Sequence, residues 1–291
     1  MTPTVKKKKY TLFRPMILSR HPSHDILRLK HKKIAALPYR SVIRFGSSTE
    51  VEDTVAKGGN RIEINTVNAI KISANKLLMK QKFVEAGVKT AEWLPGSTGK
   101  AVVLETIGFP MVIKAHHGSK GRGNTLIKNE DDWNDWWTKN NSSANYIFEK
   151  FMNFGHEFRL HVTEDGCFYT CRKALKQDVP EDQKWRRHDD ICVWFLETNE
   201  NFHKPNSWND IVSDCVKALK AVGADLLSFD VRVQTPRDKD GNLRPYQEYI
   251  LLECNSASSM DNGTGEVSVC AQKYIDEIPK IIIRKAKQNG R

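Results

Sequence analysis

The sequence lacks several features that would assign it at once to a familiar class of protein. No stretch of its 291 residues approaches the roughly 18 consecutive apolar residues that a membrane-spanning helix needs. Its first residues, MTPTVKKKKYTLF, contain no apolar segment of the kind that secretory signals carry. These absences exclude an integral membrane protein and predict a protein of the cytoplasm.

Closely spaced cysteine pairs are also missing. The six cysteines lie far apart and form no CxxC pair: Cys167, Cys171, Cys192, Cys215, Cys254 and Cys270. This spacing is typical of neither a disulfide framework nor a zinc site. We therefore expect six reduced thiols.

Acidic residues are nearly absent from residues 1–40. This segment contains eleven Lys or Arg and one acid, Asp25, and so carries most of the net charge of +11. A basic segment can bind phosphates or acidic partners such as nucleic acid. No recognisable nucleic-acid-binding motif accompanies it. Two interpretations stay open: a solvated tail followed by a basic face on a small domain, or a contact with nucleic acid.

The remaining chain alternates between patterns typical of strands and of helices. Strands are predicted at 41–46, 61–65, 110–114, 126–127, 146–151, 158–162, 167–174, 227–233 and 246–253. Helices are predicted at 69–86, 100–107, 130–138, 207–222 and 265–287, and a polar loop at 175–190. The pattern indicates an α+β fold with antiparallel hairpins in its C-terminal half.

A glycine-rich loop follows a predicted strand that ends in Lys114. The loop reads Gly118-Ser119-Lys120-Gly121-Arg122-Gly123. A lysine at a strand end and the N–H groups of such a loop can together bind phosphates. The loop is not a P-loop, because GxxxxGK[ST] is absent. Phosphate binding and an ordinary turn both stay open at this point.

Carboxylates inside two apolar strands form a second candidate site. Glu253 and Asn255 are two residues apart, so their side chains point to the same face of a strand. Asp230 lies on the preceding strand of a predicted hairpin. Acids inside buried strands are costly unless they are paired or bound to a metal. Carboxylate and amide oxygens suit Mg²⁺, so a metal site is favoured over a solvated hairpin face.

The order of these motifs resembles the ATP-grasp superfamily, and in particular its carboxylate–amine ligases of the ribosomal-protein glutamate ligase and D-alanine–D-alanine ligase type. The resemblance covers roughly residues 70–285 and follows, in chain order, Lys76 on a helix, Lys114, the glycine-rich loop, Glu149 on a linking strand, Asp230, and Glu253-Cys254-Asn255-Ser256. It implies an ATP-grasp fold, in which two α+β subdomains clamp ATP, with a reduced N-terminal α/β domain. The implied divisions are a basic tail and reduced N-terminal domain at 1–70, a central subdomain with the glycine-rich loop at 71–150, and a C-terminal subdomain with the metal site at 151–291.

The resemblance also implies roles for residues around the nucleotide. By this resemblance, Lys76 and Lys114 contact the α/β-phosphates, and the Gly118–Gly123 loop closes over the triphosphate. Glu149 with the backbone of Lys150 and Phe151 is implied to contact adenine, and Glu157 the ribose. Asp230, Glu253 and Asn255 are implied to hold one or two Mg²⁺.

Further residues are implied to contact the substrate. Arg159 is the candidate for a substrate carboxylate, and Arg172 or Lys173 for the γ-phosphate or acyl phosphate. Arg187 lies in the loop 185–188, where such ligases carry variable substrate contacts. The alternative for that loop is an exposed basic surface.

The implied activity is that of an ATP- and Mg²⁺-dependent carboxylate–amine ligase. Such an enzyme forms an amide or peptide bond through an acyl phosphate and releases ADP and phosphate. Its substrates would be a carboxylate and an amine, most simply an amino acid or peptide. Two alternatives stay open: an ATP-grasp enzyme acting on a nucleic-acid-linked substrate, and a non-catalytic nucleotide-binding module.

Overall fold

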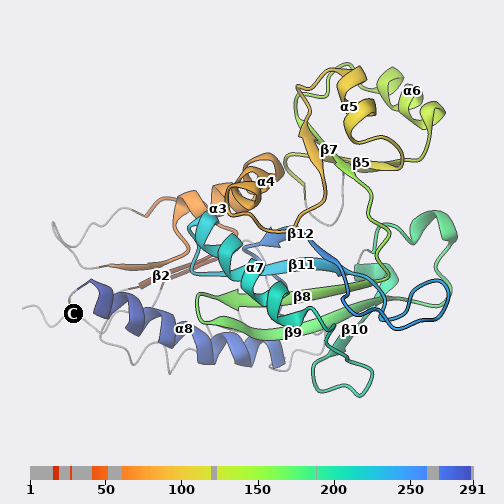
Figure 1. Ribbon diagram of the computed structural model, residues 1–291. Helices are drawn as coiled ribbons and strands as arrows, with labels where there is room; N and C mark the ends of the chain where they lie inside the picture. Colours follow the sequence, from red (N-terminus) through yellow and green to blue (C-terminus); the bar gives the residue numbers. More distant parts are fainter. Residues whose placement is uncertain are drawn as a thin grey trace, which may run out of the picture. The chain divides into compact units, whose positions relative to one another are not determined.

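The computed structural model describes residues 16–19, 27, 41–51, 61–118, 123–187, 189–260 and 269–289 (Figure 1). The chain divides into two compact units, one of Met1–Val67 with Ser259–Arg291 and the other of Asn68–Ser258. Both contain helices and strands, so the predicted α+β class is confirmed. The finer division at residues 70 and 150 stays a prediction.

The first unit contains a parallel sheet and the last helix of the chain. Its strands have the order β1 (Met16–Ser19), β2 (Ser41–Phe45) and β3 (Ile62–Ile64). Helix α8 (Val269–Gln288) packs against them through Tyr274, whose ring lies 5.9 Å from that of Phe45. The strands predicted at 41–46 and 61–65 are confirmed, whereas β1 was not predicted. Most of the basic segment 1–40 lies outside the described residues.

The second unit contains an antiparallel sheet of five strands in the order β10-β9-β8-β11-β12. These strands are β8 (His156–Thr163), β9 (Gly166–Leu175), β10 (Cys192–Leu196), β11 (Leu226–Val233) and β12 (Tyr249–Asn255). Helix α7 (Trp208–Val222) covers one face of this sheet (Figure 1). Phe158, Leu160 and Val162 of β8 share one hydrophobic cluster with residues of α7. Because side chains alternate along a strand, the residues between them occupy the opposite face.

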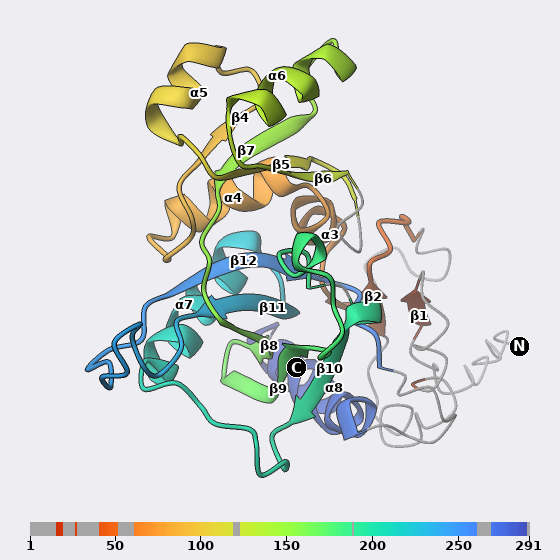
Figure 2. The same ribbon diagram turned by 90° about the vertical axis from the view of Figure 1, so that its right-hand side faces the viewer.

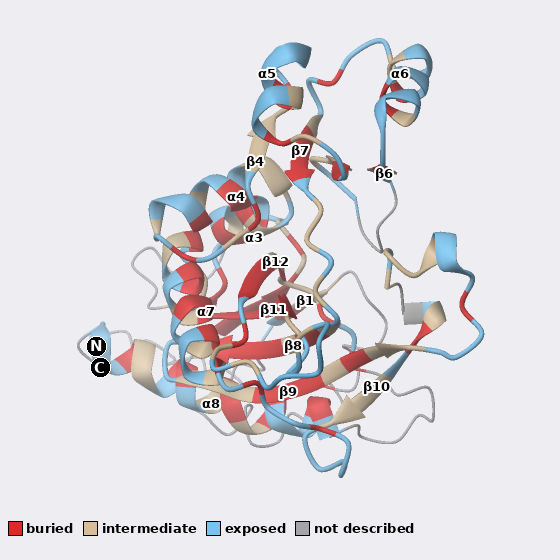
Figure 3. Cartoon of the chain, turned by 45° about the vertical axis from the view of Figure 1, so that its right-hand side comes forward, coloured by how far each residue is buried: buried red, intermediate tan, exposed pale blue. Residues whose placement is uncertain are grey.

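A smaller sheet of the same unit has the strand order β4-β7-β5-β6. Its strands are β4 (Trp93–Pro95), β5 (Met111–Ala115), β6 (Asn124–Ile127) and β7 (Tyr146–Lys150). Helices α5 (Lys100–Thr106) and α6 (Glu130–Lys139) cover one face of it (Figure 2). Trp133 and Trp136 of α6 pack with Phe148 in its core, and Figure 3 shows the outer sides of both helices exposed.

Two short helices replace the single helix predicted at 69–86. Helix α3 (Val67–Ser73) ends before Asn75, and α4 (Lys76–Glu85) begins after it. The Asn75 side chain accepts hydrogen bonds from the N–H groups of Leu77 and Leu78, and so caps α4. The prediction was wrong here because the apolar spacing continues through the break. The cap places Lys76 at the first position of α4.

Other boundaries also differ from prediction. The predicted loop 175–190 contains two 3₁₀ turns, Glu181–Gln183 and Asp189–Ile191, and leads into the unpredicted edge strand β10. Strand β4 was also missed, and β12 begins at Tyr249 rather than at residue 246. All six cysteines are free thiols, as predicted. No helix in the described ranges is long and apolar enough to cross a membrane.

Candidate functional site

The face of the five-stranded sheet opposite α7 carries a grid of polar side chains, here called the polar face. The strand register places three rows on it, because paired residues project from the same side of a sheet. The rows are Asn255–Ser228–His161–Tyr169, Glu253–Asp230–Arg159–Cys171, and Arg232–Glu157–Lys173, the last continuing to Trp194 on β10. The predicted metal ligands therefore lie on one surface with two of the candidate substrate cations, Arg159 and Lys173.

The three predicted metal ligands meet at the β11–β12 end of the polar face. Asp230 is the register partner of Glu253, and Asn255 pairs with Ser228 two residues before Asp230. The described residues contain no cluster of three or more His, Cys, Asp or Glu that could hold a metal. Two carboxylates and an amide nevertheless supply the hard oxygen donors that Mg²⁺ accepts, with water or phosphate completing its shell. The donor set therefore fits a magnesium ion bound together with phosphates.

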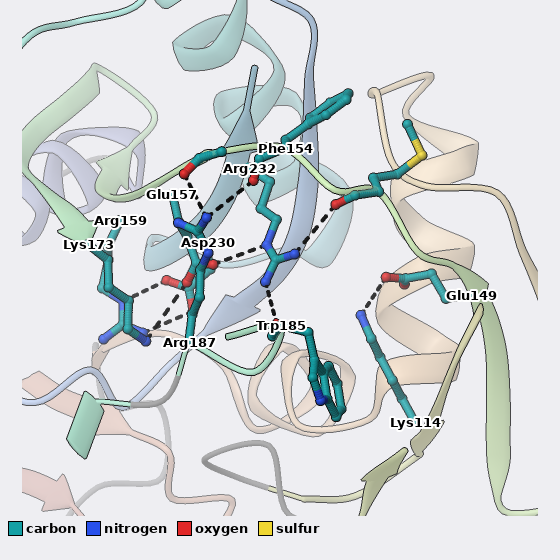
Figure 4. Close-up of polar contacts among 12 residues, drawn as sticks. Lys114, Glu149, Phe154, Glu157, Arg159, Lys173, Trp185, Arg187, Asp230 and Arg232 are labelled. Carbon is teal, nitrogen blue, oxygen red and sulfur yellow. Dashed lines mark hydrogen bonds and ion pairs between the residues drawn. The ribbon is translucent and has the colours of Figure 1, made fainter. Parts of the chain in front are cut away.

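Asp230 is held by a basic neighbour. Arg159 donates from Nε to Oδ1 at 2.7 Å and from Nη2 to Oδ2 at 2.9 Å (Figure 4). Asn255 Nδ2 donates to Oδ2 at 3.2 Å. Burial alone would raise the pKa of Asp230, but the charge and hydrogen bonds of Arg159, together with the charge of Lys173, outweigh it and hold the pKa below its ordinary value. Asp230 is therefore an ionised carboxylate.

Glu157 lies between two further cations. Arg232 Nε donates to its carboxylate at 3.2 Å, and Lys173 Nζ lies 3.8 Å from it. All three side chains are buried. The carboxylate predicted to contact ribose is thus already part of a charged row (Figure 4).

The structure separates Lys173 from Arg172, which the resemblance offered as alternatives. Lys173 pairs with Glu157 on the polar face. Arg172 pairs with Phe158 and points to the opposite face, where it donates to the carbonyl of Asn201 at 3.0 Å and lies over the Phe195 ring. Of Arg172 and Lys173, only Lys173 lies on the same face of the sheet as Asp230.

Arg187 connects its loop to the segment that follows β7. Its Nη2 donates to the carbonyl of Gly155 at 2.6 Å and reaches that of Phe154 at 3.4 Å. Arg232 holds the same loop by donating to the carbonyl of Trp185 at 2.8 Å. Burial and the nearby charge of Arg232 lower the pKa of Arg187. The hydrogen bonds of Arg187 thus hold the backbone of Phe154 and Gly155.

The two lysines predicted to bind phosphates lie on α4 and β5. Each is close to a carboxylate, on β12 and β7 respectively. Lys76 Nζ lies 3.8 Å from Glu253 and donates to the carbonyl of Gly118 at 3.2 Å. Lys114 is hydrogen-bonded to Glu149, whose other oxygen lies 2.7 Å from Lys80. The carboxylate predicted to contact adenine is therefore occupied by two lysines.

The remaining nucleotide candidates are described in part. Ser119, Lys120, Gly121 and Arg122 lie outside the described residues. Gly123 has a φ of +78°, and a Cβ there would lie 3.2 Å from that of Ala115, so the position favours glycine.

The backbone at the end of β7 is already hydrogen-bonded. The backbone N–H of Lys150 donates to the backbone carbonyl of Glu92, and the N–H of Phe151 donates to the carbonyl of Pro110. Adenine recognition by Lys150 and Phe151 stays a prediction.

Sequence reasoning missed four residues of this region: Lys80, His161, Trp194 and Arg232. Lys80 follows Lys76 by four residues, a spacing that places both on one side of a helix, so a signal was available. His161 and Arg232 continue the two-residue alternation through Arg159 and Asp230. Trp194 lies on the missed strand β10, where nothing in the sequence marks it.

Burial shifts the pKa of two potentially reactive side chains on the polar face, Cys171 and His161. Burial raises the pKa of the Cys171 thiol to about 12. Burial, with the charge of Arg159, lowers the pKa of His161 to about 3. At neutral pH the Cys171 thiol is therefore protonated and is not a reactive thiolate, and the His161 imidazole is uncharged and adds no positive charge to the polar face.

Comparison with known proteins gives a consistent result. Residues 81–225 match the family model of the ATP-grasp domain. A formate-dependent phosphoribosylglycinamide formyltransferase of Methanocaldococcus jannaschii is 30% identical over 138 residues, which is 43% of this chain and 35% of that protein. A D-alanine–D-alanine ligase of Syntrophobacter fumaroxidans is 26% identical over 124 residues, 40% of each chain. This chain thus spans well under half the length of these relatives.

Among solved structures, a D-alanine–D-alanine ligase from Bacillus anthracis complexed with ATP superimposes with a TM-score of 0.63. The two chains are 14% identical, and the match covers 96% of this chain and 100% of the other. At this identity the likeness concerns the fold.

Proposed function

We propose, from the premise that the chain contains an ATP-grasp domain and has the ATP-grasp fold, that it is an ATP-dependent carboxylate–amine ligase. The reaction forms an acyl phosphate and then an amide, with release of ADP and phosphate. The expected carboxylate and amine belong to an amino acid or a peptide.

One observation carries this proposal: the carboxylates of the polar face and of the neighbouring strand β7 are each paired with cations, and the cations are in surplus. Each of the four carboxylates is paired with one or two cations, in the sets Glu149 with Lys80 and Lys114, Glu157 with Lys173 and Arg232, Asp230 with Arg159, and Glu253 with Lys76. These ten side chains comprise six cations and four carboxylates, a surplus of two positive charges. A nucleoside triphosphate with one Mg²⁺ carries about two negative charges, which this surplus balances.

The first step needs positioning rather than a protein nucleophile. The substrate carboxylate attacks the γ-phosphorus, the bond to the bridging oxygen breaks, and ADP leaves with the electron pair. Lys76 and Lys114 are expected to hold the phosphates, and Lys173 to neutralise the transferred group. Mg²⁺, held by Asp230, Glu253 and Asn255, would supply further neutralisation.

In the second step an amine attacks the acyl carbon, and phosphate leaves. The amine loses a proton in this step, which phosphate or water can take. Arg159 is the candidate for orienting the carboxylate. Orientation and preorganised charge are the means by which such a site accelerates the reaction.

Analysis of the nucleotide products tests the proposal. The protein is incubated with Mg·ATP and pools of amino acids, peptides or oligonucleotides, and ADP, AMP and phosphate are separated. ADP and phosphate that appear only with an amino-acid or peptide pool, with hydroxylamine trapping a hydroxamate, would support the ligase. AMP would contradict it, and turnover only with oligonucleotides would favour the nucleic-acid-linked alternative.

Two variants make this experiment specific to the site. Glu253→Gln removes a proposed metal ligand and should abolish turnover. Glu248→Gln removes an exposed carboxylate that pairs with Lys89 and should leave turnover intact. ATP binding without turnover in any pool would favour the non-catalytic module.

A further inference from the structure

The strongest candidate for a metal ligand, Asp230, already carries a cation from the protein. Both of its oxygens accept hydrogen bonds from Arg159, at 2.7 and 2.9 Å, and only 9% of its side chain is exposed. Asn255 presents its NH₂ group, rather than its carbonyl oxygen, to Asp230. The contacts seen are those of an ion-paired carboxylate.

A divalent cation would compete with this arrangement. To bind Asp230 and the amide oxygen of Asn255, the amide must turn and the guanidinium must yield at least one carboxylate oxygen. Two positive groups at the same buried carboxylate also repel each other strongly, because the surroundings screen them poorly. Metal and Arg159 therefore cannot both keep their best contacts with Asp230.

The ring of Trp194 offers a place for the Arg159 guanidinium once it has released Asp230. It lies 4.9 Å from the centre of the Trp194 ring, over which Lys173 Nζ also lies at 5.0 Å. Stacking on this ring can hold the guanidinium without a carboxylate partner. Arg159 and Lys173 would then form a cationic pair beside the metal ligands.

A similar pairing occurs at the second proposed metal carboxylate. Lys76 lies 3.8 Å from Glu253 and also bonds the carbonyl of Gly118, where the glycine-rich loop begins. Each proposed metal carboxylate is therefore paired with a residue that is itself a candidate for binding anions.

We propose that Arg159 occupies Asp230 until a divalent cation binds there, and that Arg159 then binds the anionic group of the substrate. Metal and anion consequently bind with positive coupling, since each favours the state in which Arg159 has left Asp230. This inference rests on the proposed function, because it takes Asp230 as a metal ligand. It adds that Arg159 opposes metal binding in the free protein.

Titration of the free protein with Mn²⁺, followed by electron paramagnetic resonance, tests the first half. Arg159→Met removes the competitor and should bind Mn²⁺ roughly fivefold or more tightly than the wild type. Arg237→Met removes the same charge from the exposed connection between β11 and β12 and should have no effect. An unchanged or weakened Mn²⁺ affinity in Arg159→Met would overturn the proposal.

Two further variants separate this inference from the proposed function. Asp230→Asn should weaken Mn²⁺ binding; if it does not, the metal site of the proposed function is wrong. If Asp230→Asn weakens binding but Arg159→Met does not strengthen it, only the present inference fails. Arg159→Lys keeps the charge without the two-pronged contact and should give an intermediate affinity, which provides the test if Arg159→Met does not fold.

Inorganic phosphate tests the second half. Measured by calorimetry with saturating Mg²⁺, phosphate should bind the wild type roughly fivefold or more tightly than Arg159→Met. Without Mg²⁺ the two proteins should bind phosphate alike, because Arg159 is then paired with Asp230. A difference of the same size in both conditions would show that Arg159 acts independently of the metal and would overturn the coupling.

Discussion

Lys80 lies 2.7 Å from Glu149 in the interior of the second unit, and neither side chain has appreciable contact with solvent. Lys114 bonds the other oxygen of the same carboxylate, and Thr90 accepts a hydrogen bond from Lys80. Burial lowers the pKa of Lys80, whereas the two lysines together outweigh the effect of burial on Glu149 and lower its pKa. Glu149 thus fixes a lysine of α4 and a lysine of β5 to strand β7.

Glu149→Gln should destabilise the protein by about 3–5 kcal/mol, because it leaves two lysines beside an uncharged amide. Lys80→Met should cost less, since Glu149 keeps Lys114 as a partner. Urea unfolding of both variants and of the double variant measures these costs. The double variant should be more stable than the sum of the single effects indicates; strict additivity would show that Lys80 and Glu149 do not interact.

Lys114→Ala should weaken ATP binding roughly tenfold or more, the usual effect of losing a hydrogen bond to a charged group. The chain should still fold, because Glu149 retains Lys80. Calorimetric titration with ATP measures the affinity, and circular dichroism verifies the fold. Lys139→Ala, on the exposed side of α6, is the control. A folded Lys114→Ala protein with wild-type ATP affinity would refute the phosphate assignment.

Replacement of Lys173 and of Arg172 should have different effects on turnover. Lys173→Met removes a cation from the polar face and should reduce the rate of ADP formation about a hundredfold. Arg172→Met removes a cation that lies over Phe195 on the opposite face and should reduce the rate much less. Both rates are measured in the substrate pool that supports turnover. Equal losses of rate in the two variants would mean that the face of the sheet on which Lys173 and Arg172 lie does not determine their contribution to turnover.

The sequence predicts which residues share a face within a strand, but not which residues meet between strands. Alternation along β8 and β12 places Arg159 with Glu157 and Glu253 with Asn255. The register that brings Arg159 to Asp230 depends on the pairing of β8 with β11, between which β9, β10 and α7 lie in the sequence. The register that brings Glu253 to Asp230 depends on a bulge after Asp230 in the pairing of β11 with β12. Arg159 was therefore predicted as a substrate contact without its carboxylate partner.

The remaining failures also have physical causes. The apolar spacing of 69–86 satisfies one helix as well as two, and only the side chain of Asn75 reveals the break. Strand β10 follows a long polar segment and packs along the edge of a sheet, so its neighbours rather than its own pattern determine it. The helix break and strand β10 therefore depend on tertiary contacts, which the local sequence pattern does not show.

A final prediction concerns His161, which is buried beside Arg159 with its pKa lowered to about 3 from an ordinary value of 6.5. Between these values the unfolded chain binds a proton at this residue that the folded protein does not. Stability from this group is therefore present above pH 6.5 and is lost as the pH falls. The expected loss is about 1.4 kcal/mol per pH unit, or about 2 kcal/mol by pH 5.

Urea unfolding between pH 7.5 and pH 5 measures this dependence for the wild type and for His161→Gln. The variant should lose less stability over the same interval, because its side chain does not titrate. His156, whose pKa burial lowers to about 4, contributes a dependence of the same sign and remains in the variant. Asp230 does not interfere, since a carboxylate with a lowered pKa loses its contribution only at still lower pH. Parallel curves for the two proteins would mean that His161 is protonated as readily in the folded state as in the unfolded chain.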